Sequence, residues 1–110
     1  MKEKSQEVLQ GTLDMLILKA LSPAPMHGWG VAQRIQQTSR DVLRLNQGSL
    51  YPALHRLEQR GYIESQWRLS ENKRRAKYYR LTPLGHKQLV VETRSWRRFS
   101  GAVERILGTA

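Results

Sequence analysis

Polar and basic side chains concentrate in residues 47–81, in an order that suits contact with a nucleic-acid duplex. A short helix is expected first, and its outer side offers Gln47, Ser49, Tyr51, Pro52, His55, Arg56 and Gln59. A basic cluster follows, made of Lys73, Arg74, Arg75 and Lys77. A helix with a polar outer face fits a DNA major groove, and a cationic hairpin beside it fits the flanking phosphates. The sequence therefore predicts DNA binding through a winged helix-turn-helix.

Two of these side chains have two possible roles each. Arg56 has the chemistry either to read guanine through a bidentate contact or to hold a phosphate. Tyr51 either donates a hydrogen bond to a phosphate or packs under the hairpin. Residue type alone does not decide between these roles, so both stay open.

Other kinds of chemistry find little support in the sequence. The three histidines, His27, His55 and His86, fall in different expected elements and lack the spacing of a metal site. The chain has no cysteine, which excludes disulfides and thiolate ligands. No glycine-rich phosphate loop, paired carboxylates or nucleophile–base pair stands out. We therefore expect neither an enzyme nor a metal or cofactor site.

Length and charge narrow the class of partner. The 110 residues suffice for one small domain with a modest core. The net charge is +10, and residues 61–110 carry eleven basic and four acidic side chains, a net of +7. This balance favours a polyanion, which is nucleic acid or an anionic membrane surface. The polar N-terminus and short apolar runs fit neither a signal peptide nor a membrane span, so a cytoplasmic protein is expected.

Apolar periodicity predicts the helices that would position these residues. One face of a first helix collects Leu9, Leu13, Leu16, Ile17, Ala20 and Leu21. Prolines within residues 22–25 end it. A second helix is expected from His27 to about Thr38, where Gly28 and Gly30 would permit close approach of another backbone. Residues 41–45 are expected to include a brief strand.

The third helix would bury one leucine face and present the polar residues on the other. Its inward residues are Leu50, Leu54 and Leu57. Ser49 as N-cap would place Pro52 in the first turn, where proline costs least, whereas Asn46 as N-cap would place it in the second. Gly61 is expected to end the helix in the left-handed conformation.

A β-hairpin is expected next. Its first strand would bury alternate residues, namely Ile63, Trp67 and Leu69, and its second would bury Tyr79 and Leu81. The polar residues 70–76 between them would form the loop. In this arrangement Trp67 belongs to the core of the strand layer, and Trp29 fills a gap between helices.

A long C-terminal helix is expected from Thr82-Pro83 to about Leu107. Its apolar stripe resembles a coiled-coil seam, with Glu92 as the exception. A narrow stripe needs a partner, and a second copy of the chain is the expected one, with the first helix joining the interface. The expected interface residues are Leu9, Leu13, Leu89, Trp96, Phe99, Val103 and Ile106. A sharper alternative has Trp96 stacking on a planar ligand.

Four segments resemble the PadR family of bacterial transcriptional regulators. They are GTLDMLILKALS, HGWGVAQRI, GSLYPALHRLEQRGYI and RRAKYYRLTPLG, within residues 10–100. The closest likeness is to the short, acidobacterial-type subgroup. The resemblance implies a homodimeric repressor on a palindromic operator, joined through the C-terminal helix and the partner's N-terminal helix. It also implies release by a phenolic or planar effector near Trp96, although this chain lacks the larger C-terminal domain of longer members.

The expected fold is mainly α with a small β-hairpin: a winged helix-turn-helix with a long C-terminal dimerisation helix. Residues 1–81 would form the DNA-binding domain, and residues 82–110 the dimerisation helix. The rival function is a basic RNA-binding or non-specific nucleic-acid-binding protein, disfavoured because Trp67 is expected to be buried rather than free to stack. A protein-interaction module and a membrane-surface helix are weaker rivals.

Overall fold

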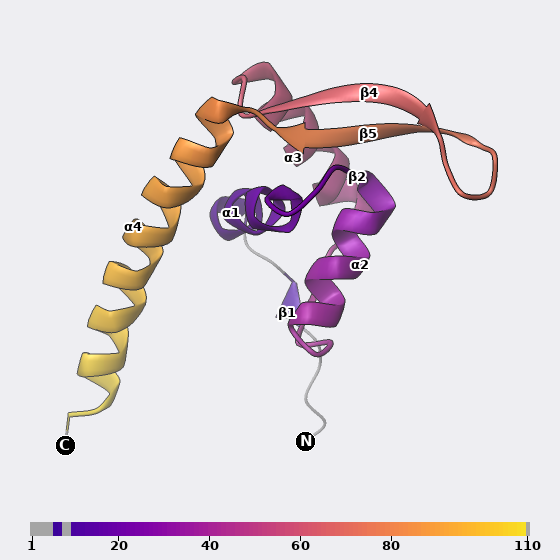
Figure 1. The fold of residues 1–110 in the computed structure, drawn as a ribbon. Coiled ribbons are helices and arrows are strands. Elements are labelled where there is room, and N and C mark those ends of the chain that lie inside the picture. The colour runs from indigo at the N-terminus through magenta and orange to yellow at the C-terminus, as the bar shows by residue number, and fades with distance from the viewer. Residues whose placement is uncertain (1–5, 8–9, 110) are drawn as a thin grey trace.

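Helices α1 (Gln10–Leu21), α2 (Gly28–Thr38) and α3 (Gln47–Gln59) surround one apolar core in the computed structural model, which describes residues 6–7 and 10–109 (Figure 1). The expected inward faces of α1 and α3 are confirmed. The buried apolar residues are Leu13, Ile17, Leu18, Ala20, Leu21, Val31, Ile35, Leu50, Ala53, Leu54, Leu57, Ile63 and Tyr79. Leu9, expected on the same face, lies outside the described residues.

The predicted hairpin is confirmed as strands β4 (Ile63–Leu69) and β5 (Arg75–Leu81). The expected burial of Leu69 is wrong, because this residue near the free end of the hairpin is 69% exposed. They pair antiparallel, from Ile63 opposite Leu81 to Leu69 opposite Arg75. A third strand, β2 (Met26–His27), pairs with the other edge of β5. This strand was not predicted, because two residues are too few to show alternation.

A second small sheet lies apart from the hairpin. Strand β1 (Gln6–Glu7) runs parallel to β3 (Leu43–Arg44). The brief strand expected within residues 41–45 is therefore confirmed, while its partner strand was not foreseen.

The N-cap of α3 is Asn46, so the preferred choice of Ser49 is wrong. The Oδ1 atom of Asn46 accepts a hydrogen bond from the backbone N–H of Gly48 at 2.7 Å. Pro52 consequently falls inside the helix, beyond the first turn. The helix continues through it because Pro52 is exposed and its neighbours Leu50 and Ala53 are anchored in the core.

Two glycines shape the joints that flank the hairpin. Gly61 has φ +80° just after α3, as predicted for a left-handed helix end. Gly85, in the first turn of the last helix, touches the hairpin's base: a Cβ built there would lie 1.9 Å from the carbonyl oxygen of Tyr62. A side chain at that position would therefore force the two segments apart.

Helix α4 (Pro83–Leu107) begins at the predicted cap, where Thr82 Oγ1 accepts from the N–H of Gly85 at 3.0 Å. Its first half contacts α1 and β5, and its second half stands away from the helical body (Figure 1). The hairpin projects on the opposite side. None of the helices in the described part of the chain is long and apolar enough to cross a membrane.

Candidate nucleic-acid interface

The outer face of α3 presents polar side chains to solvent, because its leucine face is buried in the core. The exposed residues include Gln47, Ser49, Tyr51, Pro52, His55 and Gln59. Each of these was predicted to face outward. A row of exposed polar groups on one rigid helix is the element that winged-helix proteins insert into a major groove.

Arg56 departs from this pattern, and the expectation that it faces outward is wrong. Its Nη2 atom lies 2.6 Å from Oδ1 of Asp14 on α1. Both side chains are largely covered, with 24% of Arg56 and 12% of Asp14 exposed. The guanidinium thus ties α3 to α1. Sequence spacing gave no signal for this pair, because the partners are 42 residues apart.

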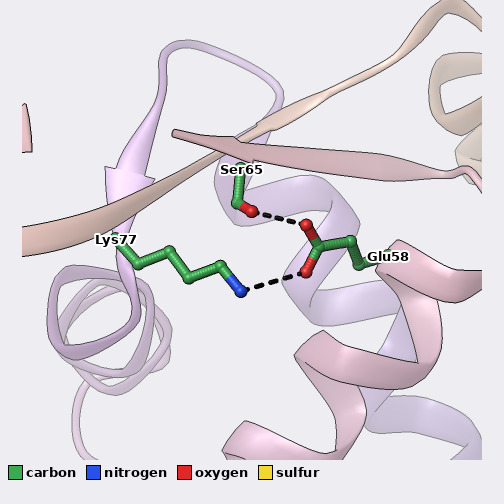
Figure 2. A network of polar contacts seen from close by, with 3 residues as sticks. All are labelled: Glu58, Ser65 and Lys77. Atoms are coloured by element: carbon green, nitrogen blue, oxygen red, sulfur yellow. Dashed lines mark hydrogen bonds and ion pairs between the residues drawn. The ribbon is translucent and has the colours of Figure 1, made fainter. Parts of the chain in front are cut away.

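Lys77 also points into the body of the protein. Its Nζ atom lies 3.4 Å from Oε1 of Glu58 on α3, and the other carboxylate oxygen of Glu58 accepts from the hydroxyl of Ser65 (Figure 2). The Ser65 hydrogen bond, with help from Lys77, lowers the pKa of Glu58 below 4.5. Lys77 therefore braces the hairpin against α3 in this structure, and its expected phosphate contact stays a prediction.

The remaining basic residues stand at the free end of the hairpin. The turn is closed by the N–H of Ser70 donating to the carbonyl oxygen of Arg74 at 2.8 Å, and by the N–H of Lys73 donating to that of Ser70 at 2.9 Å. The side chains of Lys73, Arg74 and Arg75 are all exposed. The tip therefore carries three positive charges on a closed turn.

Both tryptophans expected in the interior are exposed instead. Trp67 on β4 is 57% exposed, and Trp29 in the first turn of α2 is 55% exposed. The hairpin extends beyond the helical core (Figure 1), and residues 66–69 of β4 are exposed. The guanidinium of Arg75 lies over the Trp67 ring, with Cζ 5.1 Å from the ring centroid. Trp67 therefore does not disfavour an RNA-binding protein.

A hollow lies between α2, α3 and the hairpin, and we call it the aromatic hollow. Its lining includes Trp29, Tyr51, Trp67, Arg74 and Arg75. The Tyr51 ring packs against α2, since a Cβ on Gly28 would lie 2.9 Å from its Cε1 atom. Gly28 thus makes room for a tyrosine ring rather than for another backbone.

The first turn of α2 is held by a histidine at the same hollow. His27 is the N-cap, and its Nδ1 atom accepts from the N–H of Gly30 at 3.0 Å. Its ring meets that of Tyr78 edge-on, with centroids 5.4 Å apart. His27 is therefore a capping residue, in line with its expected place at a helix start.

The expected dimer residues divide into two groups. Leu13 is 1% exposed in the core of its own chain, so its assignment to an interface is wrong. Leu89 packs partly against that core. Farther along α4, however, Trp96, Phe99 and Ile106 are 43%, 63% and 70% exposed. Of the expected interface residues that the structure describes, the exposed ones thus lie on the outer half of α4.

Glu92, the exception in the apolar stripe, lines a groove between α1 and α4 together with Trp96. Its Oε2 atom is buried and has no hydrogen-bond partner among the described residues. Burial raises the pKa of this carboxyl above 4.5, and the nearby Asp14 charge adds to the effect. An ionised carboxyl at this place therefore opposes close packing of α1 and α4.

Taken together, these elements define a class of protein. An exposed polar helix, a hairpin with three free positive charges and a net charge of +10 form a winged helix-turn-helix suited to nucleic acid.

The comparison with protein families agrees. The sequence profile of the Transcriptional regulator PadR-like family matches residues 17–91, and the chain belongs to this family. Members are transcription regulators rather than enzymes, which agrees with the lack of a catalytic constellation in the sequence.

Individual relatives support the same assignment. A transcriptional regulator of Mycobacterium tuberculosis is 33% identical over 82% of this chain and 80% of its own. An uncharacterized 37.1 kDa protein in a transposon of Streptomyces fradiae is 42% identical over 81% of this chain, which spans only 24% of that protein. The crystal structure of a PadR-like transcriptional regulator from Bacillus cereus matches with a TM-score of 0.79 and 27% identity, covering 93% of this chain and 97% of that one.

Proposed function

We propose that the protein is a homodimeric, sequence-specific transcriptional repressor that acts in the cytoplasm on an operator in double-stranded DNA. The observation that carries this proposal is the exposed polar face of α3 beside the cationic hairpin tip. Residues 1–81 serve as the DNA-binding domain, and residues 82–110 as the dimerisation helix. His55 and Gln59 reach base edges from α3, while Lys73, Arg74 and Arg75 neutralise phosphates.

The outer half of α4 supports the dimer. Its exposed residues Trp96, Phe99 and Ile106 recur at three- and seven-residue spacing, so they lie along one side of the helix. Large apolar side chains on a helix that stands away from the body need a partner. In the proposed dimer two copies of α3 enter successive major grooves, about 34 Å apart, on a roughly palindromic operator.

A small planar or phenolic effector is the proposed inducer. Trp96 and Phe99 have ring centroids 6.1 Å apart and line the groove between α1 and α4. An aromatic ligand could enter this groove at the dimer seam and alter the angle between the two DNA-binding domains. The same groove supplies the carboxyl of Glu92 as a polar contact.

Exposed tryptophans favour one second candidate, a non-specific nucleic-acid or RNA-binding protein. Trp29 and Trp67 are exposed rings that line the same hollow as Arg74 and Arg75, and single strands bind to such surfaces by stacking. This candidate predicts equal or tighter binding to single strands than to a duplex.

Fluorescence anisotropy separates the two candidates. The purified protein is titrated onto a labelled duplex from its own promoter region, a scrambled duplex and the corresponding RNA strand, across a salt series. Tight binding to the promoter alone, with two chains per site, supports the repressor. Equal and salt-sensitive binding to all three would overturn it in favour of the second candidate.

A further inference from the structure

The aromatic hollow combines two chemical features that suit binding of a DNA backbone. Arg74 and Arg75 at its rim supply positive charge, and Trp29, Tyr51 and Trp67 supply apolar surface. The arginine side chains attract the negatively charged phosphates, whereas deoxyribose presents C–H groups that pack on aromatic rings. A surface with only one of these features would suit a free anion or a purely apolar ligand.

Within this hollow, the Arg75 side chain lies over the Trp67 ring. Arg75 pairs with Leu69 in the sheet register, and Trp67 pairs with Lys77, so the arginine and the tryptophan are diagonal neighbours on one face of the hairpin. The Arg75 guanidinium rests 5.1 Å from the centre of the Trp67 ring. A long arginine side chain held in this way loses less entropy on meeting a phosphate.

We propose that the aromatic hollow seats the sugar–phosphate backbone of one duplex strand, and that Trp67 is a positioning residue that directs Arg75 at a phosphate. This inference rests on the proposed DNA-binding function and names the strand contact within it. Base stacking is disfavoured at two of the three rings, because Arg75 covers one face of Trp67 and the Tyr51 ring packs against Gly28. Sugar C–H groups and phosphates need only the remaining ring surface and the positive charge.

The opposite face of the same hairpin provides a matched control. There Arg68 lies over the ring of Tyr78, with Cζ 4.3 Å from the ring centroid. Arg68 and Arg75 are thus both exposed arginines on aromatic rings of one hairpin, but only Arg75 lines the aromatic hollow. Replacing either one removes one positive charge, so the comparison isolates position from charge.

The test uses the full chain and a labelled random-sequence duplex, because backbone contacts do not depend on the base sequence. Anisotropy across a salt series gives the affinity and the salt slope for wild type, Arg75→Ala, Arg68→Ala, Trp67→Ala and Trp67→Phe. We expect Arg75→Ala to reduce the salt slope by about one, and Arg68→Ala to leave it near wild type. Trp67→Ala should weaken binding about threefold or more and also reduce the slope, although it removes no charge.

The conservative variant separates positioning from folding. Trp67→Phe keeps an aromatic face for Arg75 and should restore most of the affinity and the slope, and circular dichroism should show every variant folded. A slope unchanged in Trp67→Ala would overturn the positioning role of Trp67.

Other outcomes distinguish this inference from the proposed function. Equal losses for Arg68→Ala and Arg75→Ala would overturn the seat in the hollow and leave the repressor intact. Tighter binding of a single strand, with Trp67→Ala harming only that binding, would overturn the duplex-backbone assignment. Wild-type protein that binds neither promoter nor random duplex would overturn the proposed function and this inference together.

Discussion

Arg56 on α3 and Asp14 on α1 form an ion pair of 2.6 Å between residues 42 positions apart in the chain. The pair joins the helix proposed to read DNA to the helix that packs on α4. Burial is the main cause of the raised pKa of Glu92 on α4, and the negative charge of Asp14 raises it further.

Removing either partner of this pair should loosen α3 rather than change which base it reads. We expect Arg56→Gln and Asp14→Asn each to lower the free energy of unfolding by about 1–2 kcal/mol, since both charges are partly buried. The double variant should cost less than the sum, as urea unfolding would show. If the effects of the two single variants simply add up in the double variant, the two side chains do not stabilise each other. If Arg56→Gln changes the preference for one operator base, Arg56 contacts that base.

Ser65→Ala should destabilise the protein in a way that depends on pH. The folded-state pKa of Glu58 lies below 4.5, so its carboxylate stabilises the fold above 4.5, and this contribution is lost as the pH falls through the folded-state value. Without the hydroxyl, that pKa rises and stability at neutral pH falls by about 1 kcal/mol. Chemical unfolding from neutral pH to below 4.5 should show the difference shrinking, and a pH-independent difference would contradict this role.

Lys77→Ala should affect stability more than DNA binding. Its ammonium pairs with Glu58, so we expect a loss of up to about 1 kcal/mol in unfolding free energy, a modest value because the pair is partly exposed. The salt slope of duplex binding should stay near wild type, in contrast with Arg75→Ala. A slope that drops by about one would show that Lys77 contacts a phosphate after all.

Gly85→Ala should be the most damaging glycine substitution at the joint between hairpin and α4. The new methyl would meet the Tyr62 carbonyl oxygen at 1.9 Å, and relieving this clash should cost about 3 kcal/mol. Gly101→Ala is the control, because its nearest heavy atom is the end of the Arg105 side chain at 3.8 Å. Helix propensity should make that variant up to about 1 kcal/mol more stable. Thermal unfolding of both variants checks the contrast, and equal melting temperatures would refute it.

Glu92→Gln should stabilise the protein at neutral pH. Burial raises the folded-state pKa of Glu92 above 4.5, so the fold favours the protonated carboxyl; that contribution is complete below 4.5 and is lost as the pH rises through the folded-state pKa. Glutamine removes the buried charge, and its advantage should therefore vanish toward acidic pH. Glu104→Gln, at an exposed site on the same helix, should change little. Melting temperatures that fall in Glu92→Gln at neutral pH would mean that the carboxylate has a partner in the dimer.

Trp96→Ala should weaken the proposed dimer. Aromatic residues at the centre of an interface cost about 2 kcal/mol or more when truncated. Val90→Ala removes another exposed apolar side chain of α4, outside the expected seam, and serves as the control. Sedimentation velocity at micromolar concentration should show monomer for Trp96→Ala and dimer for the control. Identical dissociation constants would argue against the seam.

Several features could be predicted from local sequence because their causes are local. The leucine faces of α1 and α3, the Thr82 cap and the left-handed Gly61 depend on residues within one or two turns of each other. The N-cap of α3 was predicted wrongly because Asn46 and Ser49 are both suitable caps and lie three residues apart. Whether the helix can hold Pro52 beyond its first turn depends on core packing, which local sequence does not show.

The positions of the charged and aromatic side chains could be predicted only in part from the sequence. Their types mark residues 47–81 as a nucleic-acid surface, and the basic content follows from composition alone. Which side chains are free is decided only by the folded arrangement: Arg56 turns to Asp14, Lys77 turns to Glu58, and Trp67 stays exposed. Each outcome depends on whether a residue far away in the chain lies close by in the fold. The spacing of apolar residues along the sequence does not predict such contacts.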